Sequence, residues 1–110
     1  MRIFRAAVAA GLLATIAVPV SAETPNRAEL AASVKAGLLA QRFGVATYAA
    51  GGDGIDVRSD LATLNLSDVP TVMVELGNMR SAAEARVMTS PSGRARYARG
   101  LVSGVRRFLG

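Results

Sequence analysis

The chain has 110 residues, a formal net charge of +5, and neither cysteine nor histidine. This length allows at most one small domain, with little margin for burying a core. Without cysteine there are no disulfide bonds, no thiol chemistry and no thiolate metal site, and without histidine there is no imidazole ligand.

Met1–Ala22 has the pattern of a secretory signal peptide. Arg2 and Arg5 give a basic start, residues 6–18 form an apolar stretch too short to span a bilayer comfortably, and small residues suited to cleavage follow. The alternatives are an uncleaved membrane anchor and a buried helix. We expect cleavage after Ala22, which releases Glu23–Gly110 to the periplasm, cell wall or exterior without a stable membrane anchor.

The residues from Thr24 onward predict an amphipathic helix that ends near Arg42, before Gly44. A threonine followed by proline, and an asparagine three residues before Glu29, are helix-start signals. The apolar stripe of this helix consists of residues that recur every four positions: Leu30, Val34 and Leu38.

Val45–Ala50 is a candidate short strand, and residues 51–54 are a glycine-rich turn. The turn lacks the lysine that would follow in a P-loop, so it does not predict a phosphate site. Asp53, Asp56 and Asp60 miss the spacing of an EF-hand calcium loop. They are therefore expected to form a solvated acidic loop.

Residues 60–66 predict a turn of helix or a short strand, and Val69–Leu76 predicts a strand buried on both faces of a parallel sheet. Glu75 lies near the carboxyl end of that strand, where open α/β sheets collect ligands and catalytic groups. A glutamate in such a place is costly unless it is paired, hydrated or chemically active. The structural alternative is a buried ion pair of Glu75 with Arg58 or Arg80.

Two helices are predicted at the end of the chain. Ser81 and Glu84 have capping-box spacing before a helix over 82–88, and Ser90-Pro91 opens the last helix. The last helix places its apolar residues on one face: Tyr97, Ala98, Leu101, Val102, Val105, Phe108 and Leu109. Seven arginines follow Met79, and this basic face could contact anionic cell-wall polymer or nucleic acid, or simply be solvated.

The segments PTVMVELGNM and AAEARVMTSPSGRARYARGLVSGVRRFL, with SDLATLNLSDVP before them, resemble the C-terminal half of the zinc-dependent N-acetylmuramoyl-L-alanine amidases. The resemblance covers roughly residues 24–109 and is carried by an ordered series of matches. It implies an α/β, partial amidase-like fold in Glu23–Gly110, with a parallel-type strand and covering helices. It also implies peptidoglycan as the partner, cleaved between muramic acid and L-alanine. Nucleic acid is not expected as a partner, because the basic face lacks interleaved aromatic residues and an exported protein rarely meets nucleic acid.

In this resemblance Glu75 is the glutamate that takes a proton from zinc-bound water. The two histidines and the glutamate that hold zinc in the family belong to its N-terminal half, which this chain lacks. Zinc is thus expected for the family, but no metal-binding or cofactor-binding residue is assigned to this chain alone. Ser81 also stands where the family often has asparagine, which puts the detailed geometry of that loop in doubt.

Two classes of function follow from these observations. The chain is either an amidase, or half of one that a complementing N-terminal half restores, or a non-catalytic secreted remnant that binds cell wall or a partner. The absence of histidine favours inactivity for the isolated chain.

Overall fold

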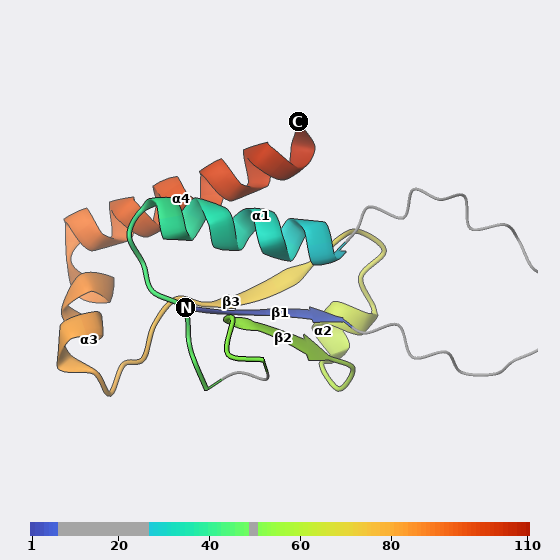
Figure 1. The fold of residues 1–110 in the computed structure, drawn as a ribbon, viewed down its shortest axis with the longest axis horizontal. Coiled ribbons are helices and arrows are strands. Elements are labelled where there is room, and N and C mark those ends of the chain that lie inside the picture. Colours follow the sequence, from blue (N-terminus) through green and yellow to red (C-terminus); the bar gives the residue numbers. More distant parts are fainter. Residues whose placement is uncertain (7–26, 49–50) are drawn as a thin grey trace, which may run out of the picture.

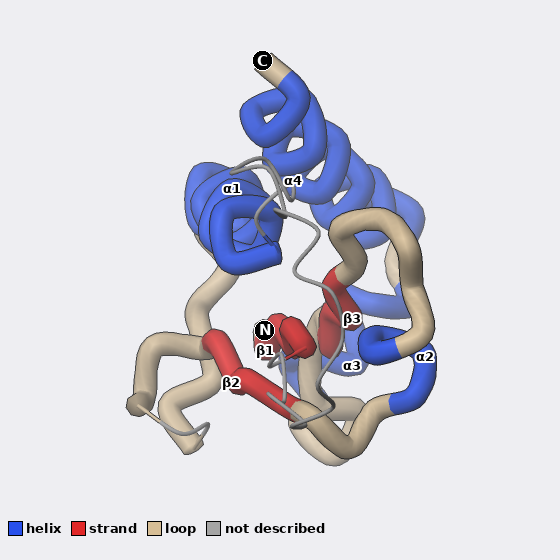
Figure 2. The backbone as a smooth tube through the Cα atoms, turned by 90° about the vertical axis from the view of Figure 1, so that its right-hand side faces the viewer, coloured by secondary structure: helices blue, strands red, loops and turns tan. Residues whose placement is uncertain are grey.

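The computed structural model describes residues 1–6, 27–48 and 51–110, which form one mixed sheet and four helices (Figure 1). The elements are, in chain order, β1 (Arg2–Ala6), α1 (Arg27–Ala40), β2 (Ile55–Arg58), α2 (Ala62–Asn65), β3 (Val72–Glu75), α3 (Ala82–Thr89) and α4 (Pro91–Leu109). Helices α1 and α4 lie side by side over one face of the sheet, and α2 lies toward the other (Figures 1 and 2). This arrangement confirms the predicted α/β class.

The order of strands in the sheet is β2-β1-β3. β1 pairs with β2 in parallel and with β3 antiparallel, and the end-on view shows β1 between the other two (Figure 2). The strand that carries Glu75 is therefore an antiparallel edge strand and not the parallel inner strand expected from its apolar sequence.

β3 is also shorter than the predicted run, Val69–Leu76. Pro70 has no N–H for a sheet ladder, and the strand begins only at Val72. Val72 and Val74 turn toward the core, whereas Met73 and Glu75 are exposed. This alternation is what a strand with one covered face shows, so the prediction of burial on both faces was wrong.

The middle strand, β1, comes from the first residues of the expected signal peptide. The side chain of Ile3 is 0% exposed and belongs to the core with α1, and that of Phe4 is 4% exposed and packs against Leu64 of α2. The two side chains thus point to opposite faces of the sheet, as successive strand residues must. The rest of Met1–Ala22 lies outside the described residues.

Helix α1 confirms the predicted helix and its stripe, since Leu30, Val34 and Leu38 are all buried. The expected capping residues at 24–26 lie outside the described residues. Gly44 does not end the helix. The chain turns at Arg42, which adopts a left-handed φ of 62°, and the amide of Phe43 donates to the carbonyl of Leu38.

The region between α1 and β3 differs from the prediction at one strand. Residues 45–48 form no strand, and 49–50 lie outside the described residues. The strand is β2 instead, whose Ile-Asp-Val-Arg sequence is too short and too charged to stand out by its pattern. The helical alternative for residues 60–66 is confirmed by α2.

The starts of α3 and α4 are confirmed. The hydroxyl of Ser81 accepts from the amide of Glu84 at 3.4 Å, and the hydroxyl of Ser90 accepts from the amide of Gly93 at 3.0 Å. The predicted apolar face of α4 is only partly correct. Tyr97 is buried and Leu101 and Phe108 pack against the core, but the remaining large apolar residues are exposed: Val102, Val105 and Leu109.

Glycines explain this difference, because α4 approaches α1 along a face without side chains. A Cβ atom on Gly37 would lie 2.2 Å from the carbonyl oxygen of Gly100, and one on Gly104 would lie 2.5 Å from Cα of Val34. The two helix backbones therefore nearly touch, and the contact turns Gly100 and Gly104 inward where larger residues would be expected.

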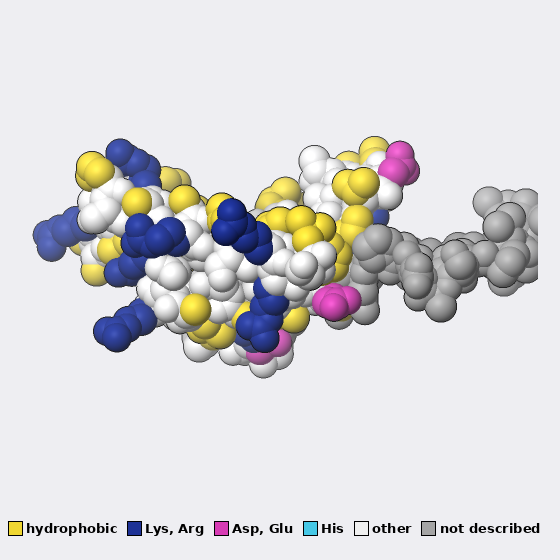
Figure 3. All heavy atoms as spheres, turned by 90° about the horizontal axis from the view of Figure 1, so that it is seen from above, with side chains coloured by type: hydrophobic (Ala, Val, Ile, Leu, Met, Phe, Trp, Pro, Cys, Tyr) yellow, Lys and Arg dark blue, Asp and Glu magenta, His cyan; other side chains and the backbone are white. Residues whose placement is uncertain are grey.

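The outer surface of α4 is basic. In the view onto α1 and α4, arginine and lysine side chains are spread across the face (Figure 3). Among the described residues, no ion pair joins an arginine of α4 to a carboxylate.

Within the described residues, no helix has both the length and the apolar character needed to cross a membrane.

Candidate active site

A cavity of about 360 Å³ lies at the carboxyl end of β3, bounded by Glu75, Asn78, Glu84, Tyr48 and Tyr97. Because β3 runs antiparallel to β1, this end of β3 meets the beginning of β1, and Met1 forms part of the wall. Residues 43–47 line another side. Glu75 thus stands at a strand end beside a cavity, as its place in the sequence predicts.

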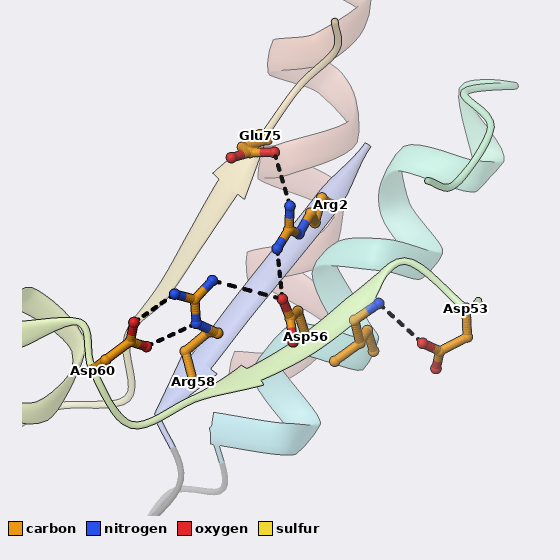
Figure 4. A network of polar contacts seen from close by, with 7 residues as sticks. Arg2, Asp53, Asp56, Arg58, Asp60 and Glu75 are labelled. Atoms are coloured by element: carbon orange, nitrogen blue, oxygen red, sulfur yellow. Dashed lines mark hydrogen bonds and ion pairs between the residues drawn. The ribbon is translucent and has the colours of Figure 1, made fainter. Parts of the chain in front are cut away.

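Glu75 is the last residue of β3, and its side chain is 50% exposed. Its Oε2 lies 4.0 Å from Nη1 of Arg2, the residue directly opposite it in the β1–β3 register (Figure 4). The predicted alternative partners, Arg58 and Arg80, do not pair with it, because the first strand brings Arg2 closer. At this distance and exposure the ion pair is weak, and Glu75 remains open to the cavity.

Arg2 connects Glu75 to a more buried carboxylate. Nη2 of Arg2 donates to Oδ2 of Asp56 at 2.6 Å, and the Asp56 side chain is only 13% exposed. The hydrogen bond to Asp56 raises the pKa of Arg2, with smaller contributions from the charges of Asp56 and Glu75. The guanidinium also lies over the Phe4 ring, 4.4 Å from its centre, so packing as well as charge fixes its place.

The three aspartates predicted to form a solvated loop also take part in ion pairs (Figure 4). Asp53 lies 3.7 Å from Nζ of Lys35, and Asp60 accepts two hydrogen bonds from Arg58, which lower the pKa of Asp60. Asp56 is held by Arg2 on the sheet. Asp53 and Asp60 are exposed, as expected for a solvated loop, whereas Asp56 lies in β2 and is largely buried beside Arg2.

The loop after β3 is tied to the start of α3. Oε2 of Glu84 accepts from the amide of Asn78 at 2.7 Å, so it caps this loop and not the amide of Ser81 that a capping box would use. A Cβ on Gly77 would lie 3.0 Å from the same oxygen, which shows how closely the loop passes Glu84. This contact places a second carboxylate at the cavity.

Tyr97 of α4 forms the floor of the cavity with Phe43. Their rings stack with centres 4.0 Å apart and planes 4° from parallel, and the guanidinium carbon of Arg96 lies 4.2 Å from the centre of the Phe43 ring. Burial, followed by the charge of Glu84, raises the pKa of Tyr97, against the opposing effect of Arg96. The neutral phenol is therefore favoured in the folded chain.

We expect Tyr97 to ionise at a pH above the ordinary value of about 10. Because its pKa is raised on folding, it contributes stability that is complete below the unfolded value and is lost as the pH rises through the folded value. An absorbance titration of the tyrosines, compared with Tyr97→Phe, isolates this ionisation. A Tyr97 midpoint at or below the unfolded value would contradict the expectation.

The donor atoms at this site do not suit zinc. No group of three or more histidine, cysteine, aspartate or glutamate side chains in the described part of the chain could hold a metal ion. The sequence contains no histidine or cysteine, and carboxylates alone favour calcium or magnesium. What the cavity does offer is a half-exposed carboxylate, able to accept a proton, beside aromatic and amide groups.

Arg2, Glu84 and Tyr97 line or support the cavity but were not predicted as site residues. Arg2 was assigned to the leader, and no local pattern links it to Glu75, which is far away in the sequence. Glu84 was read as a capping residue and Tyr97 as core. The three residues share only their position near the end of β3, and this proximity is visible only in the folded chain.

Known proteins resemble this chain over part of their length. No family model matches it. An N-acetylmuramoyl-L-alanine amidase of Mycobacterium tuberculosis is 52% identical over 59 residues, which are 54% of this chain and 24% of that protein. The solved N-acetylmuramyl-L-alanine amidase Ami1 of Mycobacterium smegmatis matches 99% of this chain with a TM-score of 0.78 and 33% identity. This chain is similar to part of the N-acetylmuramoyl-L-alanine amidases.

The apo form of the Ami1 amidase of Mycobacterium abscessus gives a similar result, with a TM-score of 0.77 and 36% identity over 99% of this chain. The chain spans 46% and 47% of the two solved amidases. It therefore corresponds to about half of each, and the resemblance stated from its sequence is confirmed.

Proposed function

We propose that this chain carries the Glu75 part of a peptidoglycan amidase site and becomes active only when a second segment completes that site. The observation that carries the proposal is the position of Glu75, at the end of β3 and open to a cavity, in a chain that matches solved amidases over 99% of its length. The bond cleaved is the amide between muramic acid and the L-alanine of the peptide stem.

In this proposal Glu75 accepts a proton during hydrolysis. Its side chain is 50% exposed, which is enough to reach a substrate, and its Oε2 lies 4.0 Å from Nη1 of Arg2. The end of a strand holds the carboxylate more rigidly than a loop would. Tyr97 and Asn78 line the space that a peptide stem would enter.

The zinc ion implied by the family resemblance does not fit the residues of this chain. Their donor set lacks imidazole and thiolate, and the described carboxylates do not converge. In this proposal the zinc ligands therefore come from the complementing N-terminal half.

A non-catalytic role is the second candidate, and the surface of α4 supports it. This helix carries five arginines and no acidic residue, and among the described residues none of the five is ion-paired. Such a surface attracts anionic polymers. In this role the chain alone would sediment with purified cell wall in a salt-sensitive manner, without releasing stem peptides.

Mixing the chain with an N-terminal amidase half that carries the two histidines and the glutamate distinguishes the two roles. We expect no release of stem peptides from purified peptidoglycan by either part, and release by the mixture. A mixture that forms a complex yet stays inactive would favour the binding role.

We also propose that the chain is exported, because Met1–Ala22 combines a basic start, an apolar stretch and small residues before Glu23. Terminal sequencing of secreted material should then begin at Glu23. Material that retains Met1 inside the cell would contradict export.

A further inference from the structure

The middle strand of the sheet is held on both sides. Residues 3–6 of β1 pair with 55–58 of β2, and residues 2–5 pair with 72–75 of β3. The amide of Ile3 also donates to the carbonyl of Gly54 at 2.8 Å, and the amide of Ala46 donates to the carbonyl of Met1 at 2.7 Å. β2 and β3 are not neighbours in the sheet, so β1 alone connects them.

The side chains of β1 fill both faces of the sheet. Ile3 is completely buried among α1 and its neighbours, and Phe4 is buried against Leu64. Arg2 supplies the guanidinium that holds Asp56. Removing these residues would leave an apolar slot, two open strand edges, and an Asp56 carboxylate whose remaining ion pair is with Arg58 at 3.9 Å.

We propose that β2, β3, α1 and α2 form a strand-acceptor site, which the chain's own residues 1–6 fill. In this proposal, the chain cannot keep the fold described above once Met1–Ala22 has been removed. A processed chain has the slot empty, and it regains this fold only when another extended segment enters it, as in β-strand addition.

The contacts define which segment fits. It must run parallel to β2 and antiparallel to β3. It needs an apolar residue facing α1 in the place of Ile3, an apolar or aromatic residue facing Leu64 in the place of Phe4, and a basic residue near Asp56. The slot is part of the amidase-like fold, since the match to the solved amidases takes in 99% of the chain and so includes β1.

The full chain allows a direct test when a protease site is inserted between Ala14 and Thr15, outside β1. After cleavage of the folded protein, we expect the N-terminal piece to co-elute with the larger piece in size-exclusion chromatography. In denaturant, the N-terminal piece should dissociate in the same cooperative transition in which the larger piece unfolds. A labelled peptide of residues 1–7 should exchange into the slot of the cleaved protein. Separation of the two pieces with an unchanged melt of the larger one would overturn the proposal.

Point variants of the uncut chain provide a second test. Ile3→Asp should abolish the cooperative thermal transition, and a peptide with the same change should fail to exchange. Leu109→Asp introduces the same charge at a described leucine that is 73% exposed and lies outside β1, and it should leave both the transition and the exchange unchanged. A cooperative transition retained in Ile3→Asp, or lost equally in Leu109→Asp, would show that β1 is not the specific occupant.

Discussion

Replacing Glu75 by alanine should abolish the activity that returns when the N-terminal amidase half is added to this chain. A general base contributes about 10²–10⁴-fold to an enzymatic rate, so stem-peptide release should fall by at least that range. We expect this effect because Glu75 lines the cavity and its carboxylate is half exposed. Its position as the last residue of β3 also holds the carboxylate rigidly.

A matched control is available in α1. Glu29 is exposed in the first turn of this helix and takes no part in the cavity, so Glu29→Ala should leave the restored activity unchanged. Circular dichroism of both variants checks that the fold is intact. Release of stem peptides by this chain without the added half, lost in Glu75→Ala, would show that the second segment is not required.

Gly37→Ala should destabilise the fold strongly, although alanine favours helix in an isolated peptide. The added Cβ would lie 2.2 Å from the carbonyl oxygen of Gly100 and 2.6 Å from the amide nitrogen of Gly104, and both of these are backbone atoms. Helices α1 and α4 must therefore move apart. Overpacking of this kind typically costs about 1–3 kcal/mol, a large share of the stability of a small domain.

Gly44→Ala is the matched control for this change. Gly44 follows α1, has no positive φ, and a Cβ placed on it meets no atom within 4 Å. Its substitution should change the denaturation midpoint little, while Gly37→Ala lowers it clearly. Equal midpoints for the two variants would mean that α1 and α4 are not in close backbone contact.

The helices could be predicted because their signals are local. Ser81 and Ser90 each accept a hydrogen bond from an amide three residues later, and the stripe of α1 repeats every four residues. Both kinds of signal lie within one or two turns of chain, so a single sequence displays them. The structure confirms α1, α3 and α4 at nearly the predicted positions.

The sheet could not be predicted because strands depend on distant partners. β2 has only four residues, two of them charged, and Asp56 is acceptable there because Arg2 meets it across the neighbouring strand. β1 was assigned to the leader on its basic and apolar residues, which are the same features that suit it to the middle of the sheet. Composition alone does not separate these two roles.

The candidate site was therefore predicted in part. Glu75 was identified from its position at a strand end and from the family motif, and the structure places it at a cavity. Its neighbour Arg2 and the close approach of α4 depend on register and on glycine contacts. Those relations arise from tertiary packing, and the local sequence does not name the partner strand or helix.

The stack of Tyr97 on Phe43 gives the protein an internal optical probe. The sequence contains no tryptophan and two tyrosines, of which Tyr48 is 70% exposed and Tyr97 is fixed between α4 and the cavity. Near-ultraviolet circular dichroism, which vanishes when side-chain packing is lost even if helices persist, thus reports mainly on Tyr97. The signal separates a properly packed chain from one that is merely compact and helical.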